Sequence, residues 1–372
     1  MKLTIERAAL LKALGHIQSV VERRNTIPIL ANVLIDANKG KVAMTATDMD
    51  LAIIESVEAE VGKGGVTTVQ AHTLYDIVRK LPEGSQVGLD GGGDKAQVTL
   101  RAGRSNFTLA ALPAEDFPKM SGGEFPHSFE LAAADLRGLI DRTRFAISTE
   151  ETRYYLNGIY LHAAQSNGVK VLRAVATDGH RLARMEMPLP AGAETIPGVI
   201  LPRKTVMELR KLIEETQSPI AISLSDTRVR FAFDNAVLTS KLIDGTFPDY
   251  ERVIPTGNDK VMEVDCKTFA EAVDRVATIS TEKSRAVKLQ ISKGQLMLSA
   301  TSPDAGSAQE EIEVRYAASP IEIGFNSRYL LDITQQIEGD GAKFTMADAA
   351  SPTVVQDTAD QSALYVLMPM RV

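Results

Sequence analysis

The sequence predicts an α+β protein built from three similar domains, and an internal repeat is the observation behind this prediction. An apolar triplet with internal offsets of two and five opens each of three stretches of about 130 residues. The triplets are Leu3/Ile5/Leu10, Phe129/Leu131/Leu136 and Met262/Val264/Phe269. This spacing is typical of a strand that leads directly into a helix.

Each stretch then contains a hairpin and a second helix. Polar turns closed by glycine predict the hairpins, because glycine accepts the positive φ that such turns require. The turns are Asn38-Lys39-Gly40, Ser166-Asn167-Gly168 and Ser292-Lys293-Gly294. The next strands end in Ala46-Thr47-Asp48, Ala176-Thr177-Asp178 and, as a weaker echo, Ala300-Thr301-Ser302. The second helices follow from the i, i+3, i+7 spacing of Leu74/Ile77/Leu81, Val206/Leu209/Ile213 and Leu330/Ile333/Ile337.

The repeats set the domain bounds at 1–120, 128–253 and 261–372, with short linkers rich in Gly and Pro between them. Two helices are expected in each domain, over residues 7–24, 72–81, 134–145, 203–215, 267–277 and 327–338. Hairpin-connected strands with helices gathered on one side favour an antiparallel α+β layer over a doubly wound parallel sheet.

Composition excludes several classes of protein. The 372 residues are 44% hydrophobic and 24% charged, which is ordinary for globular domains with their own cores. No apolar run is long enough to span a membrane, and the amino terminus reads as a first strand and not as a signal peptide. The lone Cys266 can form neither an internal disulfide nor a thiolate metal site, so a cytoplasmic protein is expected.

Charge is distributed unevenly along the chain. The formal net charge of −7 by itself argues against a nucleic-acid partner. The six expected helices nevertheless hold sixteen Lys and Arg against eleven Asp and Glu, so the remainder carries −12. This asymmetry fits either helices that face phosphate groups or ordinary solvated helix surfaces.

The most enzyme-like string is Asp178-Gly179-His180-Arg181, which places a carboxylate near an imidazole. Its counterpart in the first repeat, Asp48-Met49-Asp50, has no histidine, and no Gly-x-Ser-x-Gly elbow is present, so the motif is interpreted as structural. A hydrolase built on Asp178 and His180 remains the enzyme alternative. The five histidines show no ligand spacing, and no glycine-rich loop has the phosphate-binding ending. Neither a cofactor nor a metal is predicted.

The string Arg153-Tyr154-Tyr155-Leu156-Asn157-Gly158 allows two interpretations. The tyrosines can be cross-strand aromatics at the start of a strand, or they can contact a phosphate backbone or stack on an exposed base.

Together these strings resemble those of the bacterial DNA polymerase III beta subunit family, the sliding clamps. The resemblance spans the whole chain and includes Arg153 to Gly158, Ala176 to Leu182, Ser240-Lys241-Leu242, Phe247 to Tyr250 and the terminal Met368-Pro369-Met370-Arg371. It implies the DNA clamp fold, with three similar domains per chain, each with two helices on an antiparallel sheet layer. It also implies that two chains close head to tail into a ring around duplex DNA.

The implied function is that of a non-catalytic processivity factor. The ring holds duplex DNA without reading bases and tethers the replicative DNA polymerase, the clamp loader and repair proteins through short linear motifs. A monomeric peptide-binding scaffold is the other alternative, and it differs from a homodimeric ring in its mass in solution.

The resemblance also assigns residues to sites. The partner-peptide cleft is expected to use Arg153, Leu156, Thr177, Gly179, His180, Arg181, Leu182, Pro248, Arg252, Val253, Val366, Met368, Pro369 and Met370. Contact with DNA is expected from Arg24, Tyr154, Tyr155, Arg203 and Lys204, although Glu150 and Glu151 lie beside the tyrosines. The dimer interface is expected to bring Arg104, Phe107 and Leu109 against Ile279, Glu310 and Glu311.

Overall fold

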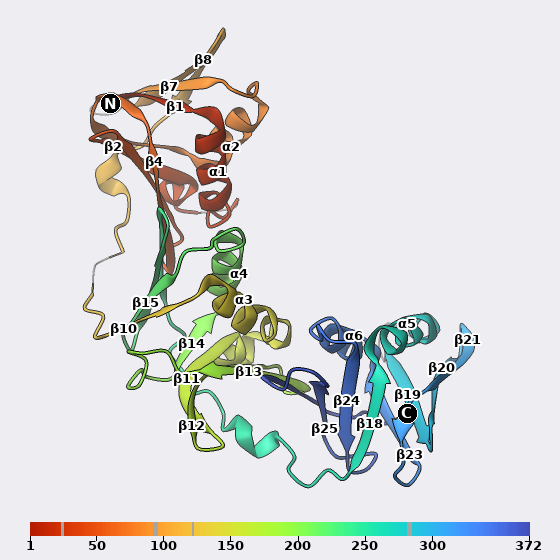
Figure 1. The fold of residues 1–372 in the computed structure, drawn as a ribbon. Coiled ribbons are helices and arrows are strands. Elements are labelled where there is room, and N and C mark those ends of the chain that lie inside the picture. The colour runs from red at the N-terminus through yellow and green to blue at the C-terminus, as the bar shows by residue number, and fades with distance from the viewer. Residues whose placement is uncertain (24–25, 92–95, 121–122, 281–284) are drawn as a thin grey trace. The chain divides into compact units, whose positions relative to one another are not determined.

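The computed structural model describes residues 1–23, 26–91, 96–120, 123–280 and 285–372 (Figure 1). These residues form two compact units. One unit comprises Met1–Arg137, Pro190–Pro197 and Lys204–Leu242, and the other comprises Gly138–Leu189, Gly198–Arg203 and Ile243–Val372. No helix in the described residues is long and apolar enough to cross a membrane.

The order of elements repeats three times along the chain, as predicted. The first repeat contains β1 (Lys2–Glu6), α1 (Arg7–Ile17), β2 (Asn32–Asn38), β3 (Lys41–Thr47), β4 (Leu51–Glu58), β5 (Glu60–Lys63), β6 (Gly65–Gln70), α2 (Ala71–Lys80), β7 (Gln86–Gly91), β8 (Gln97–Ala102) and β9 (Ser105–Ala110). The second contains β10 (His127–Leu131), α3 (Ala133–Asp141), β11 (Gly158–Ser166), β12 (Val169–Thr177), β13 (Arg181–Pro188), β14 (Val199–Pro202), α4 (Arg203–Leu212), β15 (Ile220–Leu224), β16 (Arg228–Phe233) and β17 (Ala236–Lys241). The third contains β18 (Lys260–Asp265), α5 (Cys266–Ala277), β19 (Ala286–Ser292), β20 (Gln295–Ser302), β21 (Gly306–Glu313), β22 (Arg315–Tyr316), β23 (Ile321–Asn326), α6 (Ser327–Thr334), β24 (Gly341–Met346), β25 (Thr353–Asp357) and β26 (Ala363–Leu367).

Several helices begin directly at the end of a strand, because the last strand residue caps the helix. The Glu6 carboxylate accepts a hydrogen bond from the Ala9 amide at 3.0 Å, and the Asp265 carboxylate accepts one from the Thr268 amide at 2.8 Å. The Asn326 side chain does the same for the Arg328 amide at the start of α6. Each bond satisfies one of the amides that a helix start leaves without an intrahelical partner.

Four helices end three or more residues earlier than the apolar spacing predicts. The expected helix over 7–24 stops at Ile17, and those expected to reach residues 145, 215 and 338 stop at Asp141, Leu212 and Thr334. After Ile17 the Val20 and Val21 amides bond to carbonyl groups three residues back, so the chain tightens into turns. Apolar periodicity continues through these turns, and sequence alone therefore overextends the helices.

The predicted glycine turns form the hairpins β2–β3, β11–β12 and β19–β20. Each has a two-residue loop, since Asn38 pairs with Lys41, Ser166 with Val169 and Ser292 with Gln295. In the first two loops both residues have positive φ, as for Lys39 (46°) and Gly40 (80°).

Strands of neighbouring repeats pair with each other, which the sequence does not predict. In one unit β4 pairs with β17, and this first joint gives the eight-stranded sheet β10-β15-β16-β17-β4-β3-β2-β6. In the other unit β13 pairs with β26, and this second joint gives the nine-stranded sheet β14-β11-β12-β13-β26-β25-β24-β18-β22. The remaining sheets are β5-β1-β7-β8-β9 and β21-β20-β19-β23.

The helices cover the sheets in contacting pairs. Within their own units α1 packs against α2, and α5 packs against α6, as Figure 1 shows. Cys266 at the start of α5 is buried, as expected for a small apolar side chain, and burial raises the pKa of its thiol to about 11.

Candidate functional site

The Ala-Thr-Asp motif forms a turn whose polar groups are used locally. One Asp178 carboxylate oxygen accepts hydrogen bonds from the amides of His180 and Arg181, at 2.9 and 3.0 Å. The Thr177 hydroxyl donates to the Arg181 carbonyl and accepts from the Gly179 amide. The His180 ring stacks on the Tyr329 ring, with centroids 6.4 Å apart. The geometry supports the structural interpretation of the motif and gives the hydrolase alternative no support.

The first repeat contains the same turn. The Asp48 carboxylate accepts from the amides of Asp50 and Leu51, and the Thr47 hydroxyl donates to the Leu51 carbonyl. The residue at the tip has positive φ in both turns, 77° at Met49 and 87° at Gly179. The turn is therefore a property of the repeat, and only the second copy has glycine at its tip.

A cavity of about 280 Å³ lies beside the Asp178 turn and collects most of the residues expected in the partner-peptide cleft. Ten of the expected residues line it: Arg153, Leu156, Thr177, Gly179, Arg181, Leu182, Pro248, Val253, Val366 and Met368. Tyr155, Asp249 and Tyr250 also line it. The expected residues His180, Arg252, Pro369 and Met370 are not part of this lining. We call this cavity the cleft.

The cleft has a buried apolar wall. Its lining residues Leu156, Leu182, Tyr250 and Val366 belong to a buried cluster that continues into Val175, Ile200, Phe247, Val354 and Leu364. Met368 at the mouth is 41% exposed, and Val253 is 49% exposed. A fixed apolar wall with an adaptable methionine at its mouth suits apolar side chains of varied shape.

Tyr250 is fixed from behind by a buried hydrogen-bond network. The buried Arg173 guanidinium on β12 donates to the Tyr250 hydroxyl oxygen at 3.0 Å and to the Glu186 carboxylate at 2.7 Å. The same guanidinium donates to Glu251, the residue after Tyr250, at 2.5 Å. Burial opposes the charge on Arg173, but these partners outweigh it and raise its pKa. Arg173 therefore holds both Tyr250 and its neighbour in the turn Tyr250–Val253.

His162 completes this network in a defined tautomer. Its Nδ1 lies 3.0 Å from the Ala163 carbonyl, which can only accept, so Nδ1 carries the proton. Its Nε2, 3.0 Å from the Tyr250 hydroxyl, therefore accepts a hydrogen bond from that hydroxyl. Burial, followed by the nearby Arg173 charge, lowers the pKa of His162, against the opposing effect of the Ala163 bond. The neutral ring is the form that this network requires.

Two arginines expected at the cleft rim are already engaged. Arg181 is half-buried and pairs with Asp332 at 2.5 Å and Asp178 at 3.2 Å, while its guanidinium lies 4.3 Å from the Tyr329 ring centroid. Arg153 makes a two-bond pair with Glu150, and its guanidinium covers Gly179. The hydrogen bond from Arg153 lowers the pKa of Glu150. The expected repulsion of DNA by Glu150 is thus reduced by its own arginine.

The residues expected to contact DNA are placed differently from one another. Tyr154 is 53% exposed and meets Tyr155 edge to face, while Tyr155 also lines the cleft. Arg203 is exposed at the first position of α4. Lys204 instead pairs with Asp48 at 2.5 Å and Glu22 at 3.5 Å, and the Asp48 bond raises its pKa despite the opposing effect of burial. Arg24 lies outside the described residues.

The expected interface residues lie on two edge strands. Phe107 and Leu109 are half-buried on β9, and Arg104 is in the β8–β9 turn. Glu310 and Glu311 lie on β21, and Ile279 follows α5. Glu310 already pairs with Arg275 at 2.6 Å, and that hydrogen bond lowers its pKa. In the part of the chain described, β9 pairs only with β8 and β21 only with β20.

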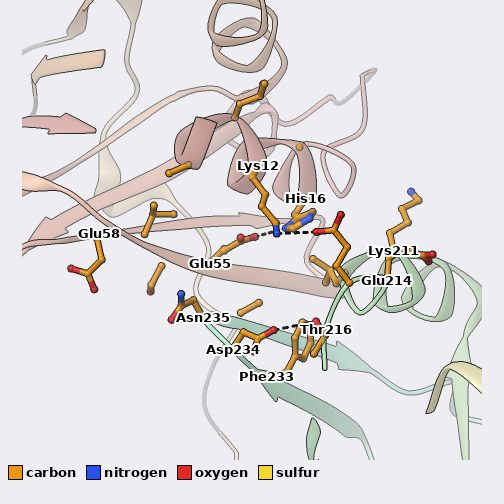
Figure 2. A pocket seen from close by; sticks show the side chains of 18 of the residues that line it. Lys12, His16, Glu55, Glu58, Lys211, Glu214, Thr216, Phe233, Asp234 and Asn235 are labelled. Carbon is orange, nitrogen blue, oxygen red and sulfur yellow. Dashed lines mark hydrogen bonds and ion pairs between the residues drawn. The ribbon is translucent and has the colours of Figure 1, made fainter. Parts of the chain in front are cut away.

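A larger cavity, of about 880 Å³, lies between α1, β4 and the β16–β17 hairpin (Figure 2). Its walls carry charges of both signs. His16 contacts Glu55 at 2.8 Å, Lys12 pairs with Glu215 at 3.1 Å, and the Thr216 hydroxyl donates to Asp234 at 3.1 Å. Figure 2 shows His16 directed at Glu55 and Thr216 directed at Asp234 across this wall. Among the described residues no group of three His, Cys, Asp or Glu could hold a metal ion.

Sequence reasoning missed two lining residues, Asp249 and Tyr250, as well as the supporting Arg173, and it assigned the lining residue Tyr155 to DNA contact alone. Tyr250 and Asp249 stand next to Pro248 in the same closing motif, so adjacency was the available signal. Arg173 gave no signal, because its role depends on a partner 77 residues away.

Comparison with known proteins gives a consistent result along the whole chain. Residues 1–121, 130–249 and 251–371 match the family models described as the N-terminal, central and C-terminal domains of the DNA polymerase III beta subunit. A beta sliding clamp from Caulobacter vibrioides is 56% identical, with all of both chains covered. A sliding clamp from Bartonella birtlesii bound to griselimycin is 51% identical and superposes with a TM-score of 0.97, again over all of both chains. A griselimycin-bound clamp from Pseudomonas aeruginosa is 39% identical, with a TM-score of 0.95 over the same full coverage.

Proposed function

Because this chain belongs to the DNA polymerase III beta subunit family, the non-catalytic sliding clamps of DNA replication, we propose that two copies close into a ring around duplex DNA. The ring tethers the replicative polymerase, the clamp loader and repair proteins, each through a short motif that enters the cleft. It acts in the cytoplasm on the chromosome. The domain bounds 1–120, 128–253 and 261–372 are part of this proposal.

One observation supports the ring: three equivalent strand pairings between repeats are possible, and a single chain forms two of them. The strand after the Asp48 turn, β4, pairs with the last strand of the second repeat, β17. The strand after the Asp178 turn, β13, pairs with the last strand of the third repeat, β26. The same rule pairs β21, the corresponding strand of the third repeat, with β9, the last strand of the first. Between two chains this pairing is head to tail, and such an interface gives a closed ring when its rotation closes.

The register of the first joint predicts the contacts of the third. Leu51 lies opposite Ser240, and Ile53 lies opposite Leu238, in the first joint. The β3–β4 hairpin, with Thr47 opposite Ala52, corresponds to the β20–β21 hairpin, with Thr301 opposite Ser307. The β16–β17 hairpin, with Phe233 opposite Ala236, corresponds to the β8–β9 hairpin, with Ala102 opposite Ser105.

Transfer of this register places Phe107 opposite Ala308, Leu109 opposite Gly306, and Arg104 opposite Glu311. Leu238, the equivalent of Phe107, is fully buried, whereas Phe107 is half-buried in the single chain. Pairing of β9 with β21 therefore covers an apolar face that the single chain leaves partly open, and it blunts two edge strands.

Retention on DNA then comes from topology. A chain of net charge −7 gains little from general attraction to a polyanion. A closed ring needs only weak contacts with phosphate groups, because leaving the DNA requires an interface to open. Phosphate contacts carry no sequence information, which suits a ring that slides. Arg24, Arg203 and the exposed Tyr154 are the proposed contacts, with Tyr155 and the already paired Lys204 as weaker ones.

A disulfide across the proposed third joint tests the ring. In the first joint the Lys241 amide bonds to the Asp50 carbonyl, and hydrogen-bonded and non-hydrogen-bonded pairs alternate along an antiparallel ladder. The pair Ala236–Glu55 is therefore a close, non-hydrogen-bonded pair. Its counterpart is Ser105 with Glu310. The variant Ser105→Cys/Glu310→Cys should oxidise to a covalently linked dimer, while Thr108→Cys/Glu310→Cys, which places the two thiols on opposite faces, should not. Native Cys266 is buried and its thiol pKa is raised, so it should contribute little to disulfide formation in this test.

The loaded, oxidised ring should stay on a closed plasmid and leave once the plasmid is cut. Equal retention on circular and linear plasmid refutes encirclement. Sedimentation addresses the other alternative, since a stable species at the mass of one chain indicates a monomeric scaffold.

A further inference from the structure

Gly324 in β23 has a neighbour that only glycine accommodates. Its backbone is ordinary extended strand and needs no positive φ. A Cβ atom at this position would nevertheless lie 2.6 Å from the Met370 carbonyl oxygen and in direct collision with the Val372 side chain. Glycine inside a strand marks close approach by another backbone, and here that backbone is the chain's own C-terminal segment.

The C-terminal segment is attached at two points. The Met368 amide donates to the His180 carbonyl at 2.9 Å, which extends the second joint by one residue. The Met370 amide donates to the Gly324 carbonyl, also at 2.9 Å, as an isolated antiparallel bridge on the outer edge of β23. Figure 1 shows the C-terminus beside this strand. Residues 368–370 therefore span from the mouth of the cleft to the edge of a different sheet.

A very short connection joins the two attachments. Met368 lines the cleft, and Met370 is seated on Gly324 two residues later. Pro369 between them has a fixed φ and removes one backbone freedom. Few backbone torsions therefore separate the Met370 seat from Met368, so a shift of the seat is expected to reach Met368.

We propose that Gly324 is a positioning residue for the cleft, which it does not line: it seats the C-terminal segment and thereby fixes Met368 at the cleft mouth. The proposal rests on the peptide-binding function proposed for the cleft. It accounts for a predicted cleft residue, Met370, that is absent from the lining. Met370 acts as the anchor of the segment, and Met368 is the side chain that a bound peptide meets.

Gly324→Ala tests this, with griselimycin as the probe because two related clamps have been solved with it. The added methyl group should push the segment off its seat and weaken griselimycin binding about tenfold, with the dimer mass unchanged. Gly88→Ala is the matched control, since a Cβ at this strand glycine meets its neighbours no closer than 3.8 Å. It should leave griselimycin affinity unaltered.

A truncated chain ending at Pro369 separates this role from a general effect on β23. Without Met370–Val372 the three atoms nearest to the methyl group at position 324 are absent, so Gly324→Ala should then have a much smaller effect on griselimycin affinity and on melting temperature. Melting temperature decides the comparison if the truncated chain binds too weakly to measure. An equal effect in full-length and truncated chains overturns the proposal.

Amide hydrogen exchange gives a readout without ligand. In Gly324→Ala the Met370 amide should exchange much faster than in the native chain, and the Met368 amide should follow. Faster exchange with unchanged griselimycin affinity also overturns the proposal, because the seat then does not serve the cleft. Failure of the native chain to bind griselimycin is a separate result that counts against the proposed cleft function.

Discussion

The first joint, β4–β17, and the second joint, β13–β26, share an equivalent backbone hydrogen bond but differ in the size of the cavity beside them. The Lys241 amide bonds to the Asp50 carbonyl at 2.8 Å in the first joint, as the Met368 amide bonds to the His180 carbonyl in the second. Beside the second joint lies the cleft, of about 280 Å³. Beside the first lies a hollow of only about 110 Å³, lined in part by Pro118, Lys119 and Met120 of the following segment.

A few side chains produce this difference. Gly179 at the tip of the second turn is Met49 in the first, and the equivalent of Met368 is Lys241, which pairs with Asp50. Apolar Leu182 corresponds to the smaller Ala52. The repeat therefore builds the joint, while the binding site depends on substitutions that leave the backbone bonds intact.

The largest effect is expected from making the second joint resemble the first. Gly179→Met introduces the residue that the first turn has at the same position, Met49, which adopts a positive φ there. The backbone strain of such a residue is about 1–3 kcal/mol. Its side chain must displace the Arg153 guanidinium, which lies 2.6 Å from the position of the new Cβ. Griselimycin affinity, measured by calorimetry, should fall by roughly a hundredfold.

The reverse change is the control. Met49→Gly alters the first joint alone and should leave griselimycin affinity unchanged. Full affinity in a folded Gly179→Met protein contradicts the cleft as the binding site.

Local patterns predicted the turns and hairpins but not the joints. The glycine turns and the Ala-Thr-Asp motif were visible in sequence because a turn depends on neighbouring residues. The pairing of β4 with β17 joins Leu51 to Ser240, and no local periodicity reports which distant edges meet. The sequence therefore predicted the three repeats, while the pairing of strands between neighbouring repeats is seen only in the structure.

The candidate site divides in the same way. Thr177, Gly179 and Leu182 belong to a recognisable string and do line the cleft. Tyr250 was missed because its position depends on Arg173 and His162 from two other strands. Lys204 was expected to face phosphate, but Asp48, from a distant turn, pairs with it.

A second, smaller effect concerns the hydrogen-bond network of Arg173, Tyr250 and His162 beside the second joint. Tyr250→Phe keeps the apolar wall but leaves the His162 Nε2 without its donor, and should lower unfolding free energy by about 1 kcal/mol. Tyr365→Phe on β26 is the matched control, since that buried hydroxyl has no hydrogen-bond partner in the described residues. Its removal should cost nothing in a chemical denaturation series. Equal losses in the two variants contradict a specific role for the network.

A third test sharpens the contrast through pH. The pKa of His162 is lowered in the folded protein, from about 6.5 in an unfolded chain. Its contribution to stability is therefore complete above pH 6.5 and is lost as pH falls toward the folded value, since the unfolded chain takes up the proton first. The free energy of unfolding should decline over this window, and His162→Gln should flatten the decline. A native decline that persists unchanged in the variant assigns it to other groups.

The smallest effect is expected in the first joint, where the charged pair Lys241–Asp50 occupies the place that Met368 and His180 hold in the second. Both side chains are largely exposed, at 52% and 75%, and such pairs contribute about 0–1 kcal/mol because water and salt screen them. Lys241→Ala should therefore leave the melting temperature almost unchanged in 0.15 M salt. The backbone bond from residue 241 to the Asp50 carbonyl does not need the side chain, so the joint should stay closed. Rapid exchange of the residue 241 amide in this variant contradicts the view that the repeat's backbone alone maintains the joint.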